Sequence, residues 1–243
     1  MTRSSITFAL LSLLLAPAAA LAQSAPKPLS LTASAGLTVT GGNTSTSTVN
    51  VAYEALFDPK TRNVVKSDGL FLRGETEGVV SANRLNLNAR DQYALNARAF
   101  VYGQTQYLQD EFKNIDFLIA PTGGLGYKLV DNARTTLAAD AGVGAVWERN
   151  PGTSTRSSGA VTVAEKLSHS LTKTASLTHS FAALWKTQEW SDALYTVGAG
   201  IAVSISTRTQ LKVEVLDTFK NRPPSAAVKK NDVALLTAIV YKM

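Results

Sequence analysis

Apolar side chains alternate with small or polar ones over much of this chain. In residues 194–206, one parity holds the apolar set Tyr195, Val197, Ala199, Ile201, Val203 and Ile205. The other parity holds Leu194, Thr196, Gly198, Gly200, Ala202 and Ser204. Successive side chains of a β-strand point to opposite faces, so the segment predicts a strand with one apolar and one small, polar face. The same pattern recurs at residues 48–57 and 232–243.

Turn residues divide the chain into about twelve such strands, centred near residues 35, 50, 69, 87, 103, 121, 141, 164, 179, 200, 214 and 237. Connections at 58–60, 95–96, 130–132, 171–172 and 207–208 are tight, and those at 74–78, 147–158, 187–192 and 219–231 are longer. Only 41–43 breaks this alternation. The pattern predicts an all-β fold, an antiparallel transmembrane β-barrel with short periplasmic turns and longer extracellular loops.

A sheet in hydrocarbon must close on itself, because each unpaired backbone group there costs several kcal/mol. We therefore expect the last strand to pair with the first, near residues 31–40. Aromatic side chains near the predicted strand ends are expected to form interfacial girdles. They are Phe57, Phe112, Tyr127, Trp147, Trp185, Trp190, Tyr195, Phe219 and Tyr241.

The first residues have the features of a secretion signal. Arg3 precedes an apolar run over residues 6–16, and Ala20-Leu21-Ala22 is a small-residue cleavage site. The run is shorter than the roughly 20 residues of a spanning helix. We predict a signal peptide at 1–22, a short periplasmic segment at 23–30 and the barrel at 31–243, located in the outer membrane of a diderm bacterium.

Composition leaves a second fold class open. A mean hydropathy of +0.03 suits a soluble periplasmic β-sandwich as well as a barrel with a polar interior. The chain has no cysteine, which excludes disulfides and thiolate chemistry. The net charge is +6, but the basic residues are spread along the strands, so we expect no nucleic-acid partner.

Several motifs resemble one known family. They are YLQDEFKNID at 107–116, GGLGYKL at 123–129, GNT at 42–44, NRPP at 221–224 and KND at 230–232. Together they make the chain similar to the salt-induced outer-membrane proteins classed as domain of unknown function family 481. That resemblance implies an outer-membrane barrel with no established biochemical role.

Catalytic and metal-binding patterns are weak. His169 and His179 are the only histidines, and each has serine or threonine neighbours that a strand would place on the opposite face. Cross-strand pairing could still bring His179 near Ser168 or Ser170, so a lipase-type or protease-type barrel hydrolase is the alternative hypothesis. Carboxylates at Asp110, Glu111 and Asp116 could gather Ca²⁺, although a solvated loop explains them better. The glycines at 123, 124 and 126 indicate close packing or a bend.

The lumen is the remaining candidate site. Parity predicts eight lumen-facing charges: Glu54, Arg84, Arg90, Asp140, Lys166, Lys212, Glu214 and Lys242. It also places Ile115 outward and Asp116 inward. Glu165 falls on the lipid face, where a carboxylate is costly, so we expect a bulge between Gly159 and Leu167 that turns it inward.

We expect a monomeric barrel without enzymatic chemistry, cofactor or metal. The family resemblance implies envelope maintenance linked to salt response as one expected role. A narrow small-solute pore is the other, since mixed lumen charges suit a plugged interior or a weakly selective pore. Its expected partners are outer-membrane lipids and the general barrel-insertion machinery.

Overall fold

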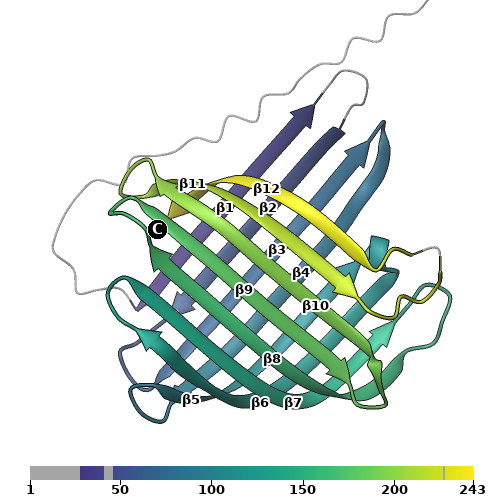
Figure 1. Ribbon diagram of the computed structural model, residues 1–243, viewed down its shortest axis with the longest axis horizontal. Coiled ribbons are helices and arrows are strands. Elements are labelled where there is room, and N and C mark those ends of the chain that lie inside the picture. Colours follow the sequence, from purple (N-terminus) through teal and green to yellow (C-terminus); the bar gives the residue numbers. More distant parts are fainter. Residues whose placement is uncertain (1–27, 41–45, 227) are drawn as a thin grey trace, which may run out of the picture.

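The computed structural model describes residues 28–40, 46–226 and 228–243, and within them the chain forms a closed antiparallel barrel of twelve tilted strands (Figure 1). The strands are β1 (Leu29–Thr40), β2 (Thr46–Phe57), β3 (Asn63–Thr76), β4 (Val79–Ala94), β5 (Ala99–Asp110), β6 (Ile115–Asp131), β7 (Thr135–Arg149), β8 (Arg156–Ser170), β9 (Ala175–Lys186), β10 (Glu189–Ser204), β11 (Thr209–Lys220) and β12 (Asn231–Lys242). A short 3₁₀ helix, η1 (Glu111–Lys113), follows β5. The predicted fold class is confirmed, and the sandwich alternative is excluded by the closed sheet.

Closure occurs where the sequence predicts it. Residues 32–35 of β1 pair with residues 239–242 of β12, and this pairing closes the sheet into a barrel. Just beyond this ladder, a Cβ on Gly36 would lie 1.7 Å from the Thr237 carbonyl oxygen. The amide of Asn50 on β2 donates to the same oxygen over 3.3 Å. Glycine is required at position 36 because the two strands approach each other too closely there for any side chain.

The two ends of the barrel differ. One end, the turn rim, carries the start of β1, the end of β12 and the connections 58–62, 95–98, 132–134, 171–174 and 205–208. The other end, the loop rim, carries the connections 111–114, 150–155 and 221–230. Two predicted long loops on that rim are wrong: β3 joins β4 through Glu77 and Gly78, and β9 joins β10 through Thr187 and Gln188. The strands there extend further than expected, and Glu77 and Gly78 both take positive φ, as a two-residue hairpin requires.

Register fixes which side chains face inward. On β5, Phe100 and Tyr102 are 4% and 5% exposed and face the interior. On β3, Leu72 faces inward, and Phe71 and its neighbour Arg73 face outward. Alternate side chains of β3 and β5 therefore face the lumen.

Three aromatic residues form one cluster on the outer wall. Trp185, Tyr195 and Phe219 come from β9, β10 and β11, and the Trp185 indole donates to the Tyr195 hydroxyl over 3.0 Å. The ring centroids lie 5.8 Å apart for Trp185 and Tyr195, and 6.0 Å apart for Tyr195 and Phe219. All three lie toward the loop rim, where an interfacial girdle is expected.

Two facing predictions are wrong. The expected bulge in β8 is absent, because pairing with β7 and β9 continues without a shift from Gly159 to Leu167. Glu165 therefore stays on the outer wall, where His179 of β9 bonds to it. The second error is at the start of β6, where a register shift against β5 places Ile115 inside, 1% exposed, and lets Asp116 bond Arg149 at the rim.

Most of the predicted domain boundaries near the N-terminus lie outside the described residues. The signal peptide at 1–22 and most of the segment at 23–30 lie outside the described residues. The first strand begins at Leu29, two residues before the predicted start. Among the described residues, no helix has the length and hydropathy needed to cross a membrane.

Candidate functional site: the lumen

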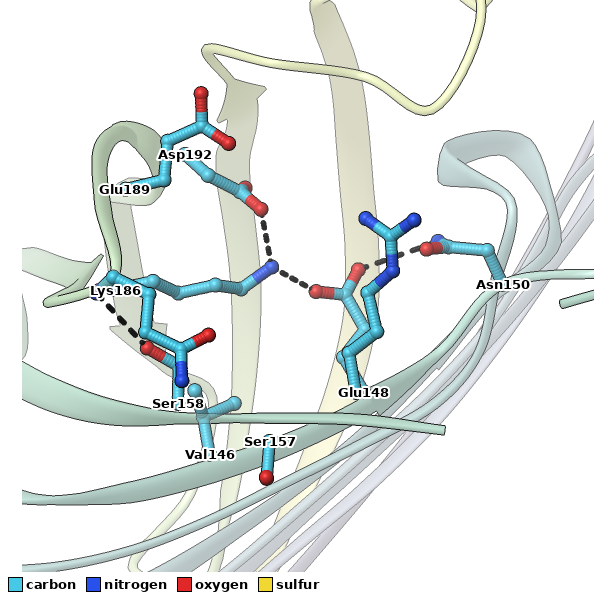
Figure 2. Close-up of a pocket in the computed structure, with 10 residues that line it drawn as sticks. Val146, Glu148, Asn150, Ser157, Ser158, Lys186, Glu189 and Asp192 are labelled. Carbon is cyan, nitrogen blue, oxygen red and sulfur yellow. Dashed lines mark hydrogen bonds and ion pairs between the residues drawn. The ribbon is translucent and has the colours of Figure 1, made fainter. Parts of the chain in front are cut away.

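A buried carboxylate lies inside the barrel near the loop rim. Glu148 of β7 is 4% exposed and bonds both Lys186 of β9 and Lys220 of β11. Figure 2 shows Lys186 between Glu148 and Asp192, with its Nζ 2.5 Å from the Asp192 carboxylate, and Asn150 on the other side of Glu148. Since β8, β9 and β10 separate β7 from β11, the bond from Glu148 to Lys220 crosses the interior.

A second contact crosses the lumen nearby. Arg84 of β4 is 8% exposed and donates to the Thr218 hydroxyl of β11, with β3, β2, β1 and β12 between the two strands. Its guanidinium also lies 3.8 Å from the Asp110 carboxylate of β5. Desolvated charges are costly unless they are paired, so these bonds fix the side chains in place.

Helix η1 forms the third crossing. Asp110 caps it, accepting from the backbone N–H groups of Phe112 and Lys113 over 3.1 Å each. The Lys113 side chain is fully buried and its Nζ donates to the carbonyl oxygens of Lys229 and Lys230, at 3.0 and 2.7 Å. It also lies 2.8 Å from the Asp232 carboxylate at the start of β12. The loop after β5 is thereby fastened to the opposite wall.

Apolar side chains fill the space beside these contacts. A buried cluster lines the inner face of β5 to β10: Leu108, Ile115, Leu118, Ala120, Val146, Ala160, Leu184 and Leu194. We call this cluster together with Arg84, Asp110, Lys113, Glu148, Lys186 and Lys220 the outer constriction. It closes the loop-rim end of the lumen by packing and by charge pairing.

An arginine stacked on aromatic rings lies in the turn-rim half. Arg90 bonds Asp140 and Gln104, each over 3.0 Å, and its Cζ lies 3.7 Å from the centroid of Tyr102. The Phe100 ring takes space that only glycine leaves free, since a Cβ on Gly126 would lie 2.1 Å from it. Close packing against the Phe100 ring, as expected from the sequence, explains why position 126 holds a glycine.

Three lysines surround the lumen near the turn rim, and we call them the basic vestibule. Lys66 of β3, Lys128 of β6 and Lys166 of β8 line one pocket of about 280 Å³, together with Phe100 and Leu137. Lys128 has an exposed ion pair with Asp131 at 2.8 Å. The lumen therefore has a basic pocket at this end and side-chain bonds across it at the other.

All eight sequence-predicted lumen charges share the inward parity of their strands. Arg84 joins the outer constriction, Arg90 and Asp140 pair with each other, and Lys166 joins the basic vestibule. Lys212 and Glu214 form a local pair at 2.8 Å on β11. Glu54 and Lys242 are exposed near the turn rim and stand apart from the rest.

Apart from Arg84, the charges of the outer constriction are missing from that predicted set. Lys186 and Lys220 are the last residues of β9 and β11, and Lys113 is the last residue of helix η1, so none of them lies within a stretch where alternation was read. The sequence does place Glu148 on the inward parity of its strand. It does not show that Lys186 and Lys220 reach this carboxylate from other strands.

The hydrolase pattern fails for the residues that suggested it. Ser168 and Ser170 face inward, whereas His169 and His179 face outward and bond Thr135 and Glu165. The three carboxylates suggested for Ca²⁺ each bond a different partner. Asp110 bonds Arg84, Glu111 accepts from Asn83, and Asp116 bonds Arg149. No group of three metal-binding side chains occurs in the described part of the chain.

The chain is similar to one family and to solved outer-membrane barrels. A family model described as "Protein of unknown function, DUF481" matches residues 33–243. An outer membrane channel from Pseudomonas putida F1 is 12% identical, with a TM-score of 0.51 over 90% of this chain and 97% of that one. The translocator domain of the autotransporter NalP from Neisseria meningitidis is 10% identical, with a TM-score of 0.48 over 90% of each chain. No curated protein matches this chain.

Proposed function

Since the family match spans residues 33–243, the chain belongs to the DUF481 family, and from that premise we propose that it is a narrow passage for small solutes in the outer membrane, closed at its outer end in the state described here. Its fold is that of an outer-membrane barrel. Short turns lie on the periplasmic side of such barrels, so the loop rim faces the exterior.

The outer constriction is the observation that carries this proposal. A purely structural barrel can fill its interior with apolar side chains alone, whereas this interior holds paired charges beside its apolar cluster. The bonds from Glu148 to Lys220 and from Arg84 to Thr218 join distant strands through side chains, with no folded plug domain in the described residues. Side-chain bridges of this kind can separate without unfolding the barrel, so they make a closure that can open.

Single-channel recording in planar bilayers tests the proposal. Glu148→Gln removes a carboxylate that bonds both Lys186 and Lys220, so Lys220 loses this ion pair and Lys186 keeps its bond to Asp192. We expect wild-type barrels to conduct in rare, brief steps and the variant to stay open for a much larger fraction of the time. Salt gradients across the bilayer then give the ion preference.

Glu54→Gln is the matched control, because it removes the same charge from the inner wall at a side chain without an ion pair in the described residues. It should conduct like the wild type. Heat-modifiable mobility on a gel shows whether the Glu148→Gln barrel has folded. A folded variant that gives no current would overturn the proposal of a passage.

A silent barrel is also the result expected of the second candidate, envelope maintenance in response to salt. The packed apolar cluster at the outer constriction favours that role, since it gives a rigid and sealed wall. We further propose that the chain acts without enzymatic chemistry, as a monomer whose partners are outer-membrane lipids and the general insertion machinery. The outward orientation of both histidines, away from Ser168 and Ser170, supports the first of these points.

A further inference from the structure

We propose that the basic vestibule binds a small organic anion, a carboxylate or phosphate attached to an apolar group, that enters through the turn rim. This inference rests on the proposed function in one respect: it names the class of solute that the passage takes from the periplasmic side.

The three lysines converge from distant strands. Lys66 is paired in register with Arg90 on β4, whereas Lys166 and Lys128 both pair with Ala138 of β7 from either side. In the closed sheet, β4, β5, β6 and β7 lie between β3 and β8, so Lys66 and Lys166 approach the same pocket from different walls. An anion in this pocket can contact lysines from more than one wall at once.

Positive charge in the vestibule exceeds its local compensation. Asp140 is bound to Arg90, and Asp131 is bound to Lys128. Neither Lys66 nor Lys166 has an ion pair within the part of the chain that the structure describes. Low-dielectric walls concentrate the field of such charges inside the lumen, which draws anions in.

The pocket also offers apolar and neutral polar contacts. The Phe100 ring of β5 lines it beside the lysines, and Gln92 adds an amide that can donate a hydrogen bond. A volume of about 280 Å³ accommodates a small organic molecule rather than a polymer. The preferred ligand therefore has one anionic group and one apolar face.

The way in from the turn rim is basic as well. A neighbouring pocket of about 340 Å³ shares Phe100 and Gln92 with the first and adds Arg62 and Arg98 at the rim. The Asp58 carboxylate on this path is already bound, 2.7 Å from Lys60. Its hydrogen bond to Lys60 lowers the pKa of Asp58, so the pair stays compensated at neutral pH and the arginines set the sign of the entrance.

Isothermal titration of the full-length barrel, folded in a neutral detergent, tests the inference with benzoate, inorganic phosphate and benzylammonium as probes. We expect benzoate to bind more tightly than phosphate, and benzylammonium not to bind. The double variant Lys66→Met/Lys166→Met should weaken benzoate binding about tenfold or more, because it removes both uncompensated charges. The matched control, Lys173→Met/Lys229→Met, removes the same net charge outside the pocket and should stay within about twofold of the wild type.

Two outcomes overturn the inference: unchanged benzoate binding in the Lys66→Met/Lys166→Met barrel, or equal affinity for benzoate and benzylammonium. Heat-modifiable mobility of each variant shows that the barrel has folded. Since the titration needs no current, a silent Glu148→Gln barrel overturns the passage and leaves the anion site testable. If the barrel conducts but binds benzoate and benzylammonium equally, only the anion site is overturned.

Discussion

At the residue scale, the polar pair on the outer wall is the clearest departure from the barrel pattern. Glu165 and His179 are half-buried and lie 2.8 Å apart, carboxylate oxygen to Nδ1. Val163 and Leu167 flank Glu165 on the same face of β8, and Phe181 is its partner in register. A carboxylate on a lipid-facing wall is costly, and a hydrogen-bonded partner offsets part of that cost.

Removing His179 alone should therefore lower the free energy of unfolding more than removing both Glu165 and His179. We expect His179→Leu to lower the free energy of unfolding by about 2–4 kcal/mol, because it leaves the Glu165 carboxylate unmatched in the wall. The double variant Glu165→Leu/His179→Leu should be at least as stable as the wild type. Urea unfolding in phospholipid vesicles measures both.

His169→Leu is the control for that comparison. It loses only the hydrogen bond between His169 and Thr135, 2.7 Å long and beside the turn rim, and should cost about 1 kcal/mol. An equal cost for His169→Leu and His179→Leu would show that the lipid-facing position of Glu165 carries no penalty.

At the element scale, helix η1 is held by contacts that come from far along the chain. Lys113 bonds carbonyl oxygens of the loop before β12, whereas Asp110 bonds only the helix and Arg84. Lys113→Met should release this loop and leave the barrel strands intact. We expect amide hydrogen exchange at residues 228–232 to rise about tenfold, which corresponds to about 1.4 kcal/mol of lost local stability.

Lys229→Met provides the matched comparison, since its side chain makes no bond that fastens η1, and only its backbone oxygen is used. Exchange in the loop should be unchanged in that variant. Equal exchange rates at 228–232 in the Lys113→Met barrel and the wild type would contradict the fastening role of Lys113.

Strand positions were predictable because a period of two and turn residues are local signals. The predicted centre near residue 200 falls within β10, and the pairing of β1 with β12 follows from closure alone. The hairpin at Glu77 and Gly78 was missed because glutamate rarely takes positive φ. The partners of Glu148 and Lys113 could not be predicted, because alternation assigns a side chain to a face and gives no information on what reaches it from the opposite wall.

At the scale of the whole molecule, the two ends of the lumen should respond differently to salt. The outer constriction is buried, with Glu148 4% exposed, whereas the lysines of the basic vestibule face solvent in the lumen. Salt screens exposed charges strongly and buried pairs much less, since the Debye length falls from about 10 Å at about 0.1 M to about 3 Å at about 1 M.

Raising potassium chloride between those two concentrations should therefore weaken benzoate binding about tenfold or more and leave the closed fraction of wild-type barrels nearly unchanged. Titration and bilayer recording in the same two solutions measure the two effects on one preparation. A closed fraction that falls steeply with salt would mean that water and ions already reach Glu148 and its lysines. The constriction would then be a screened surface network rather than a desolvated one, and its opening would follow the ionic strength outside the cell.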